Sequence, residues 1–264
     1  MEQQNIEPRS FQVMAKPSGP LCNLDCTYCF YLEKEKLYPG TKNWGMPPSV
    51  LESYIRQYIE SQQQEIVTFA WQGGEPTLLG IPWFENVLAL QQRYSHGKRI
   101  ENVLQTNGVT LNGDWADFFA ANNFLIGISI DGPRELHDVY RIDKGQKPTF
   151  DLVLRGIEQL IAADVRFNTL TVVNRKNSHH PLDVYRFLKQ IGSSFMPESR
   201  TPENFSGGNV TGTRRTEQKM PASPNQCQNG IPRRIPLILG PRSGILYFPI
   251  FQLWFGPLIS AEER

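Results

Sequence analysis

Apolar runs that favour strands alternate with segments of helical periodicity along most of the chain. The strands are expected at 11–18, 66–71, 100–105, 124–130 and 165–173. The helices are expected at 50–61, with Ser49 as its cap, and at 83–93, 114–121, 150–163 and 181–190. Alternation at this interval predicts βα units around a parallel sheet, and five such units fit. The sequence therefore predicts an α/β fold.

Three of the four cysteines lie together directly after the first expected strand. Cys22, Cys26 and Cys29 have the spacing Cys-x3-Cys-x2-Cys, which lets a loop bring its sulfurs toward one point. Three thiolates are one fewer than a closed zinc site or a fully ligated 4Fe-4S cluster uses. A cluster held in this way would keep one iron without a protein ligand.

Two other interpretations of the cysteines stay open. They could belong to a structural zinc site completed by a histidine or by Cys227, or they could be ordinary buried thiols. A disulfide framework is not expected, because the chain has 264 residues and four cysteines, unlike small secreted domains.

The turn Gly73-Gly74-Glu75-Pro76 follows the second expected strand. Glycine lets a backbone approach a ligand closely, and a carboxylate accepts hydrogen bonds from an ammonium group. Most turns of this composition only end a strand. Its place one strand after the cysteines favours a binding role.

The segment from Cys22 to Lys34 carries a resemblance to a known family. Cys-x3-Cys-x2-Tyr-Cys resembles the signature of radical S-adenosylmethionine (SAM) enzymes, and Cys22-Asn-Leu-Asp-Cys26-Thr-Tyr28-Cys29-Phe30-Tyr31-Leu-Glu-Lys is similar to anaerobic sulfatase-maturating enzymes. The resemblance covers about 10–196. It implies a partial (βα) TIM-like barrel, a 4Fe-4S cluster on the three cysteines, and SAM bound to the fourth iron.

The resemblance also implies the residues of the site. Tyr28, Gly73, Gly74, Glu75, Ser129 and Arg141 match SAM contacts, with Tyr28 at the adenine, Glu75 at the amino group and Arg141 at the carboxylate. Asp131 is expected to line the same pocket, whereas His137 is not assigned a contact. Tyr31, Gln72 and Gln105 match positions that face the peptide substrate.

The implied activity is oxidation of a Cys or Ser in a sulfatase peptide to formylglycine, through a 5′-deoxyadenosyl radical. Reduced flavodoxin is the implied electron donor. The family's catalytic base is an Asp of a further, Cys-rich domain, so no catalytic residue is assigned here. Two alternatives remain: a related enzyme that modifies another peptide, and a non-catalytic iron-sulfur or zinc-binding remnant.

Residues 197–264 differ in composition from the rest of the chain. They are rich in Pro, Gly, Ser and Asn without strand or helix periodicity, and Pro197 interrupts a run that begins like a sixth strand. We expect domains at 1–196, the partial barrel, and 197–264, a non-homologous and poorly ordered tail. The change suggests a truncated or frameshifted chain.

Charge and hydropathy argue against some partners. The net charge of +1 gives no reason to expect nucleic acid or an anionic membrane as a partner. The polar start lacks the apolar core of a signal peptide, and 244–259 is too short and too interrupted by proline to span a membrane. We therefore expect a cytoplasmic protein, where thiols stay reduced.

Overall fold

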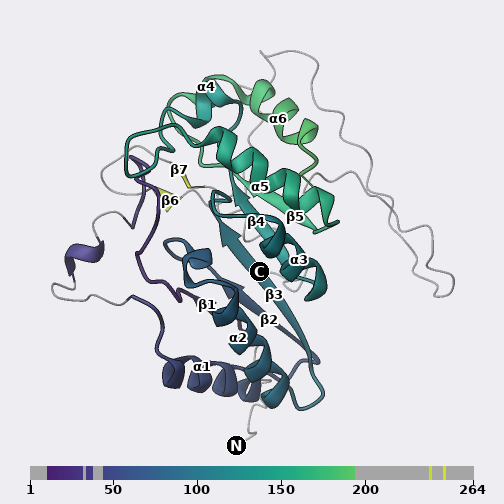
Figure 1. Cartoon of the computed structure of the whole chain (residues 1–264). Helices are drawn as coiled ribbons and strands as arrows, with labels where there is room; N and C mark the ends of the chain where they lie inside the picture. The colour runs from purple at the N-terminus through teal and green to yellow at the C-terminus, as the bar shows by residue number, and fades with distance from the viewer. Residues whose placement is uncertain (1–10, 32–33, 38–43, 194–237, 240–245, 248–264) are drawn as a thin grey trace, which may run out of the picture.

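The computed structural model describes residues 11–31, 34–37, 44–193, 238–239 and 246–247 (Figure 1). Its centre is a parallel sheet of five strands in chain order. These are β1 (Met14–Ala15), β2 (Ile66–Trp71), β3 (Arg99–Thr106), β4 (Leu125–Ser129) and β5 (Phe167–Leu170). The predicted α/β fold is confirmed.

Helices connect successive strands. The longer ones are α1 (Pro48–Ser61), α2 (Ile81–Tyr94), α3 (Gly113–Ala121), α5 (Phe150–Ala162) and α6 (Pro181–Gln190). Shorter turns of helix are η1 (Lys34–Leu37), η2 (Pro76–Leu79), α4 (Arg134–His137) and η3 (Asn177–His179). Because the strands follow chain order and parallel crossovers are right-handed, the longer helices cover one face of the sheet (Figure 1). This is the layout of a partial barrel.

The main core lies between this helical layer and the sheet. Phe69 and Trp71 of β2 stack at 5.8 Å, and Tyr54 of α1 meets both rings edge to face. Leu51 and Ile55, one helical turn apart on α1, are fully buried beside them. Burying each side chain of this size contributes about 1.5–3 kcal/mol, so this layer holds the helices against the sheet.

The predicted bounds of several elements were wrong, among them those of β1, β5 and α1. β1 has two residues instead of the expected 11–18, and β5 covers 167–170 instead of 165–173. β1 lies at the edge of the sheet and pairs only with Ala70 and Trp71, so few hydrogen bonds prolong it. Helix α1 begins at Pro48, before Ser49, and no side chain caps it. Proline suits the first helical position because its missing N–H would have no partner there.

Most of the tail lies outside the described residues. Within 197–264 the structure describes β6 (Ile238–Leu239) and β7 (Leu246–Tyr247), which pair antiparallel. The expected start of a sixth strand falls on residues beyond Ser193 that are not described, so the expected domain boundary stays a prediction. No helix among the described residues is long and apolar enough to cross a membrane.

Candidate active site

The cysteine loop, residues 20–31, leaves β1 at the carboxyl edge of the sheet. Its backbone pairs with the segment after α4. The N–H of Asp25 donates to the carbonyl of Ile142 at 2.9 Å, and the N–H of Thr27 donates to that of Tyr140 at 3.1 Å. These bonds fix the loop over a wall of the barrel that lies more than 100 residues further along the chain.

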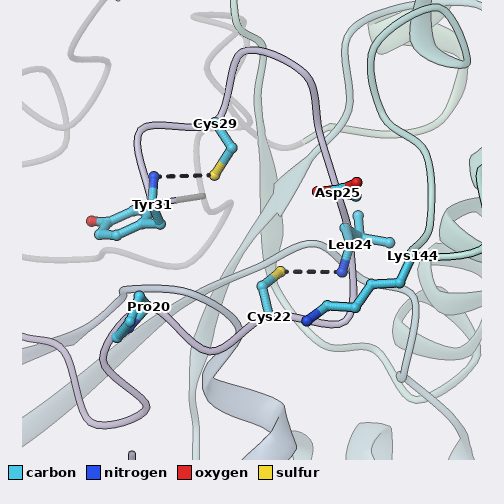
Figure 2. Close-up of a pocket in the computed structure, with 7 residues that line it drawn as sticks. All are labelled: Pro20, Cys22, Leu24, Asp25, Cys29, Tyr31 and Lys144. Atoms are coloured by element: carbon cyan, nitrogen blue, oxygen red, sulfur yellow. Dashed lines mark hydrogen bonds between the residues drawn. The ribbon is translucent and has the colours of Figure 1, made fainter. Parts of the chain in front are cut away.

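The three predicted cysteines are unpaired thiols on this loop. The N–H of Leu24 donates to Cys22 Sγ, and the N–H of Tyr31 donates to Cys29 Sγ, each at 3.4 Å (Figure 2). Cys22 and Cys29 line a cavity of about 280 Å³, together with Pro20, Leu24, Asp25, Tyr31 and Lys144 (Figure 2). Cys26 is buried, with 7% of its surface exposed, and does not line the cavity.

Burial keeps the thiols of Cys22 and Cys26 protonated in the absence of a metal. It raises the pKa of Cys22 to about 11 and the pKa of Cys26 to about 12. A thiol must lose its proton to ligate a metal, and the metal supplies the positive charge that makes this favourable. Loading of the site would therefore release protons.

The arrangement of the cysteines fits a cluster better than a single ion. Among the described residues, no three His, Cys, Asp or Glu side chains surround one point in the way that a single metal ion needs. In a 4Fe-4S cluster each cysteine binds a different iron, so the sulfurs need not share one coordination sphere. Three unpaired thiols with N–H donors at two of them are compatible with this requirement. Cys227, which could complete a zinc site, lies outside the described residues.

The Gly73-Gly74 turn holds the chain immediately before Cys22. The N–H of Gly74 donates to the carbonyl of Gly19 at 2.8 Å, and the N–H of Glu75 donates to that of Leu21 at 2.7 Å. A Cβ atom at Gly74 would lie 2.0 Å from the Leu21 oxygen. Glycine is required here because two backbones meet, which gives the predicted turn a role in shaping the cysteine loop.

Glu75 is completely buried and accepts hydrogen bonds from three residues of the chain. Its Oε1 accepts from the N–H and hydroxyl of Thr77, at 3.0 and 2.7 Å, and from the hydroxyl of Thr106 at 2.7 Å. Its Oε2 accepts from the N–H of Asn107 at 2.7 Å. Burial raises the pKa of Glu75, and these donors oppose that rise. The contact of Glu75 with the amino group of SAM stays a prediction.

Asp131 and Arg141 form a buried ion pair that contacts Tyr28 of the cysteine loop. Arg141 Nε lies 3.0 Å from Asp131 Oδ2, and its Nη2 donates to Oδ1 at 3.1 Å. The Tyr28 hydroxyl donates to Asp131 Oδ2. Burial opposes the charge of Arg141, but Asp131 outweighs it and holds the pKa of Arg141 above its ordinary value. Arg141 is thus a charged group that already has a carboxylate partner.

Gln105 and Ser129 lie side by side on neighbouring strands. Gln105 Nε2 donates to Ser129 Oγ at 3.0 Å, and Gly127, the residue paired with Gln105, leaves the space for this side chain. Gln72 lies at the end of β2, and its buried Oε1 has no hydrogen-bond partner among the described residues. The ring of Tyr31 lies 5.2 Å from Lys16 Nζ. The contact of Ser129 with SAM, and those of Tyr31, Gln72 and Gln105 with a peptide, stay predictions.

Two residues of this region were missed. Asn107 is buried and touches Cys22, and Lys144 lines the cavity of Figure 2. Asn107 could have been found, since Thr106-Asn107-Gly108 ends the strand next to the Gly73-Gly74 turn and parallel strands end at one edge. Lys144 carries no such signal, because its position depends on the pairing of the cysteine loop with 140–143.

Comparisons with known proteins agree with this geometry. A family model described as "Radical SAM superfamily" matches residues 17–188. A serine-type anaerobic sulfatase-maturating enzyme of Bacteroides thetaiotaomicron is 44% identical over 184 residues, which are 70% of this chain and 44% of that protein. A cysteine-type enzyme of Clostridium novyi is 40% identical, over 71% of this chain and 50% of that protein.

Solved structures give the same result. The structure titled "Native anSMEcpe with bound AdoMet" (AdoMet is SAM) has a TM-score of 0.60 and 38% identity, over 66% of this chain and 47% of that chain. A second structure of it, with AdoMet and a peptide bound, has a TM-score of 0.61. The chain spans about half the length of the relatives it matches. Because the family model matches residues 17–188, which include the cysteine loop and the strands β2 to β5, the chain belongs to the radical SAM superfamily.

Proposed function

We propose that this chain is the SAM-binding part of an anaerobic sulfatase-maturating enzyme, which oxidises a Cys or Ser of a peptide to formylglycine. The cofactors of its family are a 4Fe-4S cluster and SAM. The observation that carries the proposal is the cysteine loop, whose three unpaired thiols lie at the carboxyl edge of the sheet in a region about 40% identical to such enzymes.

Cys22, Cys26 and Cys29 would hold the cluster. When bound, the cluster supplies the electron that cleaves SAM. The turn at Gly73-Gly74 keeps the loop in place through its two backbone hydrogen bonds.

The SAM contacts are proposed at Tyr28, Gly73, Gly74, Glu75, Ser129 and Arg141. Arg141 keeps its charge through Asp131, which supports a role in binding a carboxylate. For SAM to reach it, the guanidinium would have to share its donors between Asp131 and the ligand. Arginine has five N–H donors, so such sharing is chemically reasonable.

Tyr31, Gln72 and Gln105 are proposed to face the peptide. The unpartnered Oε1 of Gln72 supports this, because a buried acceptor without a partner gains stability when a ligand N–H reaches it. The relatives include both serine-type and cysteine-type enzymes, so either residue is a reasonable target. A reduced flavodoxin as donor and a cytoplasmic location are also proposed, since free thiols need a reducing compartment.

The test is anaerobic reconstitution of the chain with iron and sulfide, followed by dithionite and SAM. We expect about four irons per chain and formation of 5′-deoxyadenosine. Added sulfatase peptides then test for oxidation by this chain. Oxidation of a target Ser removes the mass of two hydrogens, and oxidation of a target Cys also replaces sulfur with oxygen. The matched control replaces Cys22, Cys26 and Cys29 with Ala and should give neither iron nor 5′-deoxyadenosine.

The products separate the possible functions. 5′-Deoxyadenosine without peptide oxidation would show a working SAM site and would contradict complete sulfatase maturation by this chain alone. Oxidation of a different peptide would favour a related radical SAM enzyme. Iron-loaded protein without 5′-deoxyadenosine would favour a non-catalytic remnant. Equal iron in the chain and in the triple variant would overturn the proposed cluster itself.

A further inference from the structure

Asn107 links the cysteine loop to the end of β3. It is 7% exposed, and its amide Nδ2 lies 3.7 Å from Cys22 Sγ and 2.7 Å from Asn23 Oδ1. Its Oδ1 accepts the N–H of Val109 at 3.0 Å. The amide therefore has a fixed orientation in which one N–H serves Asn23 and the other is directed at the sulfur.

The backbone of Asn107 is held by Glu75. Its N–H donates to Oε2 of the buried carboxylate at 2.7 Å, while the hydroxyl of the preceding Thr106 donates to Oε1. Glu75 in turn donates its own N–H to Leu21, the residue before Cys22. Glu75 thus holds Asn107 through its carboxylate and holds the chain before Cys22 through its backbone N–H.

Cys22 has a second hydrogen-bond donor, Asn107, that comes from outside the cysteine loop. Cys29 receives the N–H of Tyr31 from within the same loop, and Cys22 similarly receives that of Leu24. Asn107 is 85 residues away from Cys22 in the chain and belongs to the barrel. The hydrogen bond from Asn107 therefore comes from outside the loop, and the loop could hold a cluster without it.

We propose that Asn107 is a positioning residue that donates a hydrogen bond to the Cys22 sulfur and makes the cluster easier to reduce, with Glu75 holding Asn107 in place. This rests on the proposed cluster at the three cysteines. Reduction adds negative charge to the cluster and its sulfurs, so an N–H donor stabilises the reduced form more than the oxidised one. Hydrogen bonds to the sulfurs and outer partners of the ligands are known to tune such sites.

The test is the reduction midpoint of the reconstituted cluster, followed by electron paramagnetic resonance without SAM. Asn107→Leu keeps the approximate size of the side chain and removes the donor. We expect its midpoint to shift to a more negative value. The matched control is Asn102→Leu, which removes another buried, hydrogen-bonded Asn of β3 whose partners, Trp71 and Gln91, lie away from the cysteines. Its midpoint should equal that of the unaltered chain.

Glu75 is tested through Glu75→Gln, which puts an NH₂ group in place of one acceptor oxygen. This variant also removes a negative charge that acts on Cys22, so the route through Asn107 is read from a double-mutant cycle. Asn107→Leu should shift the midpoint less in the Glu75→Gln background than in the unaltered chain. Additive shifts would contradict a route through Asn107. Since SAM is absent, a lost SAM contact of Glu75 does not enter the result.

The outcomes are distinguishable from failure of the proposed function. A cluster in the unaltered chain with the same midpoint in Asn107→Leu would overturn this inference and leave the function standing. No cluster in the unaltered chain would overturn both. If Asn107→Leu does not fold by circular dichroism, Asn107→Asp replaces it, because it keeps the shape, lacks the donor and should shift the midpoint further in the same direction.

Discussion

Asp131 and Arg141 form an ion pair that is almost fully shielded from water. Oδ1 of Asp131 also accepts the N–H of Val172 at 3.0 Å, and Oδ2 accepts the Tyr28 hydroxyl. One carboxylate thus connects the cysteine loop, the segment after α4 and the end of β5. A buried charge is stable in a folded protein only when an opposite charge and hydrogen bonds compensate it.

Replacement of Asp131 by Asn should strongly destabilise the chain. Arg141 would keep its charge in a buried place without a counterion, which costs about 3–5 kcal/mol. Urea unfolding measures the loss. The control is Asp151→Asn, which breaks a solvent-exposed pair with Arg134 and should change the unfolding free energy little. Equal effects of the two substitutions would contradict this account.

His137 should make the free energy of unfolding of the chain decrease at acidic pH. It is fully buried, accepts the N–H of Asp131 and meets the Thr149 hydroxyl. Burial and the nearby Arg141 lower its pKa from 6.5 to about 3, while Asp131 opposes the shift. Because the unfolded chain binds this proton first, the stabilisation is complete above pH 6.5 and is lost as the pH falls toward 3.

The loss attributable to His137 should reach about 2 kcal/mol at pH 5. Urea unfolding at a series of pH values, compared with His137→Gln, isolates this contribution. The variant keeps an acceptor and a donor but does not titrate, so its stability should depend less on pH. Parallel pH profiles for the two proteins would show that His137 is not the titrating group.

The cysteine loop is an element without regular structure of its own. It takes its shape from the Gly73-Gly74 turn on one side and from residues 140–143 on the other. A loop braced by two neighbours changes shape when either neighbour moves. Its geometry is therefore sensitive to small changes at the turn.

Gly74→Ala should reduce cluster assembly several-fold while the sheet still folds. The added Cβ would overlap the Leu21 carbonyl, at 2.0 Å, so the chain before Cys22 has to shift. Iron per chain after reconstitution measures the effect, with circular dichroism to verify folding. Gly113→Ala, at the start of α3 with its nearest neighbour at 3.6 Å, is the matched control and should load normally.

Across the whole molecule, the core and the site occupy different places. The core cluster is built from the sheet and the helical layer, with members such as Phe69, Leu104 and Ile157, and it includes none of the three cysteines. The site lies at the carboxyl edge, where loops meet. Catalytic groups on the loops of such a barrel can change while the core stays the same.

Removal of all three thiols should therefore leave the fold intact. The variant with Cys22, Cys26 and Cys29 replaced by Ala should have a free energy of unfolding within about 1–2 kcal/mol of that of the cluster-free chain, because little apolar contact is lost. Leu104→Ala, in the centre of β3, should cost about 2–5 kcal/mol. Urea unfolding measures the stability of both variants. A triple variant as unstable as Leu104→Ala would contradict the prediction and show that the cysteine side chains stabilise the fold.

The sequence by itself determined the order of the strands and helices and the place of the cysteine loop. Periods of 2 and 3.6 are local properties, so the apolar run Ile66–Trp71 and the helix at 181–190 were predicted with their observed bounds. The cysteine spacing is likewise local. The α/β fold and the family followed from these features.

Only the tertiary structure decided which partners the site residues have. Glu75 meets Asn107, and Tyr28 meets Asp131, across 32 and 103 residues. Such contacts depend on the register of parallel strands and on how the loops pack at their ends. A sequence pattern contains neither, because each hydrogen bond is fixed by segments that are far apart in the chain and are brought together by the core.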